Sequence, residues 1–263
     1  MARDIGGRGP AVPALAVALA ALAAQVSLAA CSTGSPAPAA AASPSITADC
    51  VSPGTPLAKR VVHFASADHQ ETVEAYVRTP FTGSGGGARA KSPGIGIVID
   101  HQSSQSLCDS MSWADQFAAE GYLAVAPSLD DGSLVTETEG AVAYLRAHGA
   151  TQIVLLGASM GGTTVLATAA KLQPPVQAVI SVSGPTAYAM ADAGTAAPDL
   201  TVPVFYSAGA GDTDFAQNET DMYNATKEKD KLLDIVPVTD QHGFDLLSSL
   251  LTDINIFIQK YTH

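Results

Sequence analysis

Positive charge is scarce in this sequence. Its 263 residues include 13 Lys and Arg against 25 Asp and Glu, a formal net charge of −12. An acidic chain repels nucleic-acid phosphates and anionic lipid headgroups, and no stripe of basic residues offsets that repulsion here. The balance argues against nucleic-acid binding and fits solubility outside the cell.

Common signatures of bound cofactors are also missing. The glycines of Gly83–Gly87 precede a predicted strand instead of following one, so they do not form a dinucleotide fingerprint. No Gly-Lys-Ser/Thr sequence marks a phosphate-binding loop, and no His/Cys cluster has the spacing of metal ligands. We therefore expect no organic cofactor and no metal. No internal repeat is visible.

The N-terminus has the pattern of an export signal. Arg3 and Arg8 precede an apolar run, Ala11–Ala24, and small residues follow it. Residues 28–31, Leu-Ala-Ala-Cys, resemble the lipobox of bacterial lipoproteins, which implies that residues 1–30 are removed and that Cys31 carries lipid. Several acyl chains on one residue would hold the protein stably at a membrane. An ordinary signal peptide and an uncleaved anchor are the alternatives, and all three interpretations predict an extracytoplasmic protein.

A tether and a disulfide are expected next. Residues 31–58 begin with a Pro-, Ala- and Ser-rich stretch without an apolar face, which is typical of a flexible tether and leaves residues 59–263 for one domain. The sequence has 3 cysteines. With Cys31 assigned to lipid, Cys50 and Cys108 can pair in an oxidising compartment. Two unpaired thiols, one of them buried, are the alternative.

Strand and helix signals alternate through the expected domain. Polar and apolar residues alternate in Lys59–Arg78, which predicts an antiparallel hairpin. From Ile95 onwards, continuous apolar runs alternate with helical segments, which predicts an α/β fold with a mostly parallel sheet between helices. The expected strands are Ile95–Ile99, Tyr122–Ala126, Ile153–Leu156, Val176–Val182, Val202–Tyr206 and Leu233–Val238. The expected helices are Trp113–Glu120, Leu134–His148, Gly162–Leu172, Thr220–Lys231 and Phe244–Lys260.

The segment from Gly157 to Gly161 joins a predicted strand to a predicted helix and has the pattern Gly-x-Ser-x-Gly. A turn this tight strains the backbone of Ser159, and glycines two residues before and after it remove side chains that would clash. The turn lifts the Ser159 hydroxyl above the sheet. It also places the Met160 N–H at a helix N-terminus, where the helix dipole favours a developing oxyanion. Ser159 is therefore the expected nucleophile.

With this motif the sequence resembles the α/β-hydrolase family over Lys59–His263, nearest to its compact dienelactone hydrolase and small carboxylesterase branch. In that family the order along the chain is nucleophile, acid, histidine. Of the 6 histidines, only His242 and His263 follow Ser159. His263 is the last residue and is expected to fray. His242 precedes Gly243 after the last predicted strand, as the family's base does, so the resemblance implies that His242 activates Ser159.

The resemblance also implies an acid and an oxyanion donor. Asp212 follows a predicted strand in the pattern Gly-x-x-Asp of the family's acid turn, and Asp214 is the alternative. A backbone N–H after Ile95–Ile99 should hold the oxyanion together with that of Met160. Many relatives have His-Gly there, whereas this chain has Gln102 in place of the glycine, so either Gln102 or Ser103 would donate. His101 fits a structural loop residue better than a catalyst.

Residues 184–198 are too few for a large helical cap, so we expect an open, shallow site suited to short-acyl or exposed esters. The expected function is a serine hydrolase that cleaves carboxylic esters through an acyl-enzyme. A thioesterase, a lactonase or a peptidase on the same residues is an alternative, as is a non-catalytic surface lipoprotein. The expected partners are an ester substrate and, through the lipid, a membrane.

Overall fold

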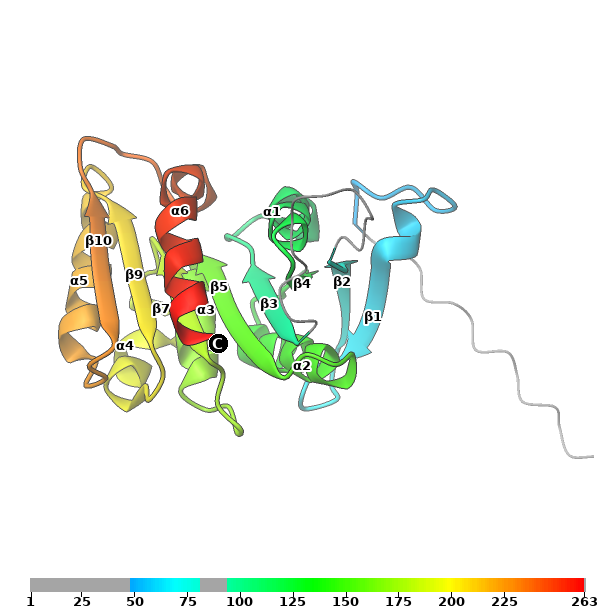
Figure 1. The fold of residues 1–263 in the computed structure, drawn as a ribbon, viewed down its shortest axis with the longest axis horizontal. Helices are drawn as coiled ribbons and strands as arrows, with labels where there is room; N and C mark the ends of the chain where they lie inside the picture. The colour runs from blue at the N-terminus through cyan, green and yellow to red at the C-terminus, as the bar shows by residue number, and fades with distance from the viewer. Residues whose placement is uncertain (1–47, 81–93, 263) are drawn as a thin grey trace, which may run out of the picture. The chain divides into compact units, whose positions relative to one another are not determined.

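The computed structural model describes residues 48–80 and 94–262. The predicted signal peptide, Cys31 and the predicted tether up to residue 47 lie outside these ranges, as do Gly83–Gly87 and His263. The described residues form an α/β structure around a sheet of 8 strands (Figure 1).

The sheet is mostly parallel, as predicted. Its strand order is β1-β2-β4-β3-β5-β6-β9-β10. The predicted hairpin is present, because β1 pairs antiparallel with β2, and β2 is also antiparallel to β4. All later neighbours are parallel, so their carboxyl ends meet at one edge (Figure 1). The strands are β1 Val61–Ala65, β2 Thr72–Arg78, β3 Ile95–Asp100, β4 Leu123–Pro127, β5 Gln152–Ala158, β6 Ala178–Val182, β9 Val204–Gly209 and β10 Lys231–Val236.

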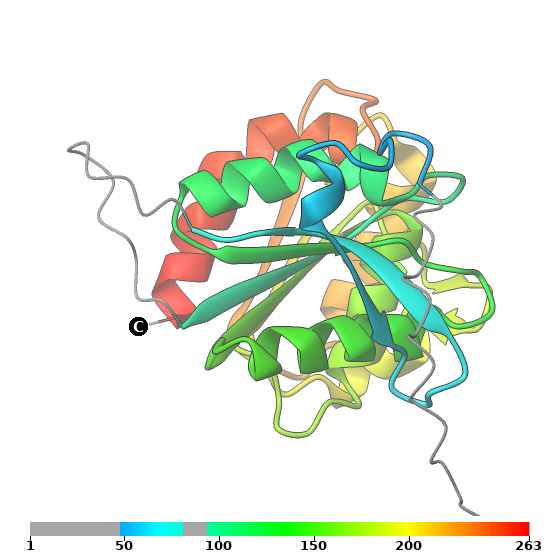
Figure 2. The ribbon, with the colours of Figure 1, turned by 90° about the vertical axis from the view of Figure 1, so that its right-hand side faces the viewer.

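Helices cover both faces of the sheet, as predicted. Figure 2 shows α1 and α6 on one face and α2 on the other. Phe117 of α1 and Leu250 of α6 share one buried core cluster, whereas Val142 of α2, Leu166 of α3 and Met222 of α5 belong to a second. The α-helices are α1 Leu107–Ala119, α2 Leu134–Ala147, α3 Met160–Ala169, α4 Ala193–Ala196, α5 Thr213–Ala225 and α6 Phe244–Tyr261, with 3-10 turns η1 Ala58–Arg60 and η2 Ala197–Asp199. Within the described ranges, no helix combines the length and apolarity needed to cross a membrane.

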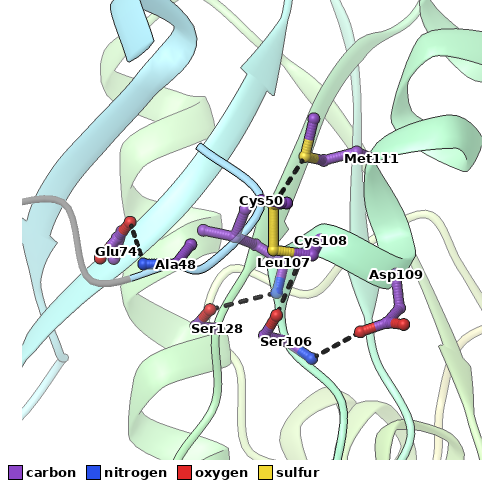
Figure 3. Close-up of a disulfide and its surroundings, with 9 residues drawn as sticks. All are labelled: Ala48, Cys50, Glu74, Ser106, Leu107, Cys108, Asp109, Met111 and Ser128. Atoms are coloured by element: carbon purple, nitrogen blue, oxygen red, sulfur yellow. Dashed lines mark hydrogen bonds between the residues drawn. A yellow bond between two sulfur atoms is a disulfide. The ribbon is translucent and has the colours of Figure 1, made fainter. Parts of the chain in front are cut away.

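The predicted start of α1 at Trp113 is wrong, because the helix begins at Leu107. Ser106 caps it: the Ser106 hydroxyl accepts from the Cys108 N–H at 3.2 Å, and the Asp109 carboxylate accepts from the Ser106 N–H at 3.0 Å (Figure 3). These bonds satisfy N–H groups that a helix N-terminus leaves free. A polar capping sequence therefore starts the helix well before its first large aromatic residue.

The predicted helix Thr220–Lys231 is wrong at both ends, because α5 spans Thr213–Ala225. Lys231 lies instead in β10, where its ammonium donates to the carbonyl oxygens of Tyr223 and Thr226 at 2.7 and 2.6 Å. A cation on the last carbonyls of a helix is favourable. Lys231 thus closes the end of α5 from the neighbouring strand.

The structure contains the predicted disulfide between Cys50 and Cys108, which joins residue 50 to the first turn of α1 (Figure 3). The chain before it already contacts the sheet, because the Ala48 N–H donates to a Glu74 carboxylate oxygen at 3.3 Å. Val51 is only 4% exposed and belongs to the core cluster shared with α1 and α6. The last part of the predicted tether, from Ala48 onwards, therefore packs on the domain.

Candidate active site

Ser159 lies between β5 and α3 in a strained conformation. Its φ is 52° and its ψ is −117°, a region that residues other than glycine rarely adopt. The Ser159 N–H donates to the Val182 carbonyl of the adjacent strand β6 at 2.8 Å, which holds the turn in place. The residue is only 8% exposed, so neighbouring residues cover most of its surface.

The two glycines of the motif are there because backbone passes too close for a side chain. A Cβ on Gly157 would clash with the carbonyl oxygen of Gly161, and one on Gly161 would clash with the carbonyl oxygen of Asp100 at the end of β3. Neither partner can move aside, because both are backbone atoms. The steric reason inferred from the sequence for these glycines is thus present in the structure.

His242 lies on the loop between β10 and α6 and contacts Asp212. Its Nδ1 is 2.7 Å from the Asp212 Oδ2. Asp212 is the N-cap residue of α5, yet its side chain does not cap that helix and accepts from His242 instead. Asp214, the alternative acid, is exposed in the first turn of α5, and no contact with His242 is found for it among the described residues. Phe215 packs edge-on against the His242 ring, with centroids 4.3 Å apart.

The His242 loop and the Ser159 turn meet at the same edge of the sheet. A Cβ built on Gly243 would lie 3.3 Å from the Cβ of Ala158, directly before Ser159. The Gly243 N–H donates to the Ser183 hydroxyl at 3.1 Å, just beyond the end of β6. Between the described Ser159 and His242 side chains themselves there is no direct hydrogen bond. The structure therefore brings the two residues into one neighbourhood at the carboxyl edge of the sheet.

The expected oxyanion donors flank the Ser159 turn. Met160 is the first residue of α3, so its N–H has no partner one turn earlier in the helix. Gln102 lies just after the end of β3. This strand pairs with β5, and β5 leads directly into the Ser159 turn. A Cβ on Gly161 would meet the His101 carbonyl oxygen at 2.8 Å, so the loop after β3 touches the turn directly.

His101 is part of the scaffold of this loop. It is 1% exposed, its Nδ1 lies 2.7 Å from the Gln102 carbonyl oxygen, and its Nε2 accepts from the Leu129 N–H at 2.9 Å. These partners require the proton on Nδ1, and burial lowers the pKa of His101, so the ring is neutral. Both ring nitrogens are used, which agrees with the structural role expected from the sequence.

The sequence analysis missed Glu219, a buried carboxyl beneath the site. Its Oε1 accepts from the Ser181 hydroxyl at 2.7 Å and from the Gly184 N–H at 2.6 Å. Burial raises the pKa of Glu219 to about 8. Glu219 thus anchors the chain on either side of Ser183, which in turn binds Gly243. A glutamate in an amphipathic helix gives no sign of this in the sequence, whereas Ser183 could have been found from its place directly after a strand.

A polar hollow of about 440 Å³ opens beside the His242 loop. Trp113 lines it and also packs near Phe244, with ring centroids 6.3 Å apart, so this tryptophan serves both as wall and as packing. Across the described ranges, no group of three or more His, Cys, Asp or Glu side chains is placed to hold a metal ion. The lining residues are Gln105, Asp109, Trp113, Gln241, Phe244, Asp245 and Ser248.

Comparison with known proteins identifies the fold. A family model for the α/β-hydrolase fold matches residues 105–224. No curated protein matches the chain in sequence. Similar solved structures include the esterase domain of a Rhodothermus marinus protein, 14% identical with a TM-score of 0.60, covering 77% of this chain and 98% of that one. The dienelactone hydrolase from Anabaena variabilis is 19% identical with a TM-score of 0.60, covering 77% and 99%.

An acylaminoacyl peptidase from Pyrococcus horikoshii also resembles the chain, with 13% identity and a TM-score of 0.58, covering 77% of this chain and 41% of that one. At these identities the likeness concerns the fold. The sheet order, the strained serine between β5 and α3, and the family model together identify this chain as a protein of the α/β-hydrolase fold.

Proposed function

We propose that the protein is a serine hydrolase that cleaves carboxylic esters, with Ser159 as nucleophile, His242 as base and Asp212 as the acid that orients it. The observation that carries the proposal is the 2.7 Å hydrogen bond between His242 Nδ1 and Asp212, next to a serine held at a φ of 52°. A serine hydroxyl is a weak nucleophile unless a base accepts its proton, and a carboxylate on Nδ1 leaves Nε2 free for that task.

In the proposed reaction the Ser159 oxygen bonds to the ester carbonyl carbon while its proton passes to His242 Nε2. The tetrahedral intermediate collapses, the bond to the alcohol oxygen breaks, and His242 returns the proton to that oxygen. Water then attacks the acyl-enzyme, giving its proton to His242, and Ser159 leaves with that proton. The sum is one ester and one water converted into one acid and one alcohol.

Two backbone N–H groups would hold the oxyanion, those of Met160 and Gln102. Met160 supports this role because it begins α3, where the free N–H and the helix dipole favour negative charge. Gln102 supports it because its loop contacts the Ser159 turn through the His101 carbonyl. Loss of one such donor costs roughly 3 kcal/mol in the transition state.

Short-acyl or exposed esters are the proposed substrates. Between β6 and β9 the chain forms only a two-strand hairpin, β7 Ala187–Tyr188 and β8 Ala191–Asp192, followed by the short α4 and η2. These elements are too small to cover a long acyl chain. Resemblance to an esterase domain and to a dienelactone hydrolase favours ester chemistry, whereas resemblance to an acylaminoacyl peptidase keeps amide cleavage as the second candidate.

Lipid attached to Cys31 is the proposed anchor, which would place the hydrolase outside the cytoplasm at a membrane. Support comes from the sequence pattern before Cys31. Exchange of Cys31 for serine should move the protein from the membrane fraction to the soluble fraction of expressing cells; an unchanged membrane fraction would rule out this anchor.

A fluorophosphonate probe tests the serine mechanism, because it labels only a serine whose hydroxyl is activated. The wild type should be labelled at Ser159, and Ser159→Ala should lose labelling and reduce kcat for a short-acyl ester by about 10⁶-fold with little change in stability. Matched ester, thioester and amide substrates would then rank the alternatives. An unlabelled but folded wild-type protein would reject the proposal.

A further inference from the structure

We propose that the side chain of Gln102 is a positioning residue that fastens the His242 loop to the loop carrying the oxyanion donor. This inference rests on the proposed function and assigns to Gln102 a task beyond that of its backbone N–H. The Gln102 side-chain oxygen accepts a hydrogen bond from the Phe244 N–H at 2.5 Å, across 142 residues of sequence.

The start of α6 needs this bond. A helix N-terminus leaves its first N–H groups free, and a polar side chain at the N-cap position usually accepts one of them. The N-cap residue of α6 is Gly243, which has no side chain to offer. The Asp245 and Leu246 N–H groups bind the carbonyls of His242 and Gly243, each at 3.1 Å, so the Phe244 N–H depends on Gln102. Gln102 thus caps α6 from a distant loop.

Gln102 is itself firmly held. Its carbonyl oxygen lies 2.7 Å from His101 Nδ1 and accepts from the Gln105 N–H at 3.2 Å. His101 is in turn fixed through its Nε2 by the Leu129 N–H. Hydrogen bonds therefore hold the Gln102 backbone, whose N–H would be the oxyanion donor. The Gln102 side chain connects this fixed backbone to the start of α6.

The contact between Gln102 and Phe244 affects the position of His242, because the intervening residue Gly243 is packed between Gln102 and Ala158. Gln102 Oε1 occupies the space that a Cβ on Gly243 would need, and Ala158 lies on the other side, at 3.3 Å from that position. The Gly243 N–H is bound by Ser183. Two hydrogen bonds on successive peptide groups, to Ser183 and to Gln102, thus set the backbone immediately after His242. Without the second, the imidazole would lose its alignment toward Ser159.

The test compares Gln102→Leu with Gln102→Glu in the full chain. Leucine has a similar size but cannot accept a hydrogen bond, so kcat for a short-acyl ester should fall by about tenfold to hundredfold, as expected for a catalytic group displaced by about 1 Å, while KM changes little. Glutamate keeps an acceptor oxygen at the same reach and should restore most of kcat. Gln116→Leu is the matched control, because this glutamine is exposed on α1, where its side-chain amide donates to Glu120 at 2.8 Å; its kcat should stay at the wild-type value.

A second readout separates misplacement from unfolding and does not depend on activity. The proton on His242 Nδ1 bound to Asp212 should give a downfield ¹H NMR signal in the wild type, Gln102→Glu and Gln116→Leu, and this signal should broaden or vanish in Gln102→Leu. Wild-type kcat and an intact signal in Gln102→Leu would overturn the inference, as would failure of Gln102→Glu to recover. A wild type that shows the signal but hydrolyses no ester would overturn the proposed function, while a signal that Gln102→Leu alone disturbs would still support the loop contact.

Discussion

Asp212 occupies the N-cap position of α5, but its carboxylate binds His242 instead of the helix, with Asp212 Oδ2 2.7 Å from His242 Nδ1. A carboxylate at an N-cap position ordinarily accepts hydrogen bonds from the N–H groups in the first turn of the helix that follows. Here the backbone of Asp212 starts α5 while the side chain is free to bind the imidazole. One residue thus begins α5 with its backbone and binds the His242 ring with its side chain.

Exchange of Asp212 for asparagine should therefore reduce kcat by about 10⁴-fold. The amide cannot hold the His242 tautomer that leaves Nε2 free to accept a proton, although the residue keeps its size and place. Asp214→Asn is the matched control, since Asp214 is two residues away and exposed, and its kcat should stay within a few-fold of the wild type. Ester hydrolysis at saturating substrate measures both. Equal losses in the two variants would show that Asp212 has no special role.

Glu219 should make the stability of the protein fall as pH rises. Burial raises its pKa in the folded state to about 8, while in the unfolded chain a glutamate titrates near about 4.3. Between these values the folded state holds a proton that the unfolded state has released, so the free energy of unfolding decreases with rising pH, by at most about 1.4 kcal/mol per pH unit. Below the lower value and above the higher one this group contributes no slope.

Glu219→Gln removes that titration and keeps an oxygen for the Ser181 and Gly184 donors. Urea unfolding at pH 5, 6, 7 and 8 should show the variant gaining stability relative to the wild type as pH rises. Asp100, whose pKa burial also raises to about 8, is present in both proteins and serves as the common background. Parallel curves for the two proteins would contradict the assignment of a neutral Glu219.

The disulfide should stabilise the fold by limiting the unfolded chain. Cys50 and Cys108 are 58 residues apart, and a disulfide typically contributes about 2 to 4 kcal/mol, with a long loop such as this one at the upper end in the chain-constraint model. The double exchange of Cys50 and Cys108 for serine should lower the free energy of urea unfolding by that amount. Reduced wild type should match the double variant, and a reductant should leave the variant unchanged. If reduction does not move the wild-type midpoint, the bond is not what holds residue 50 to α1.

Local constraints of this protein can be derived from short stretches of its sequence. Apolar periodicity predicted a mostly parallel sheet between helices, because continuous apolar runs suit strands covered on both faces. The steric need for Gly157 and Gly161 around Ser159 could be argued from the motif alone, because it concerns backbone atoms a few residues apart. The start of α1 at Leu107, earlier than predicted, is also a local feature, because Ser106 and Asp109 form a capping box within four residues of sequence.

Which distant groups meet depends on the three-dimensional packing of the chain. Asp212 and Asp214 have nearly the same sequence context, and the choice between them as partner of His242 depends on how α5 starts. The bond from Gln102 to Phe244 and the burial of Glu219 beneath Gly184 depend on the strand order, which brings the ends of β3, β5 and β6 to one edge. Such contacts follow from the packing of the whole sheet, and no short-range pattern encodes them.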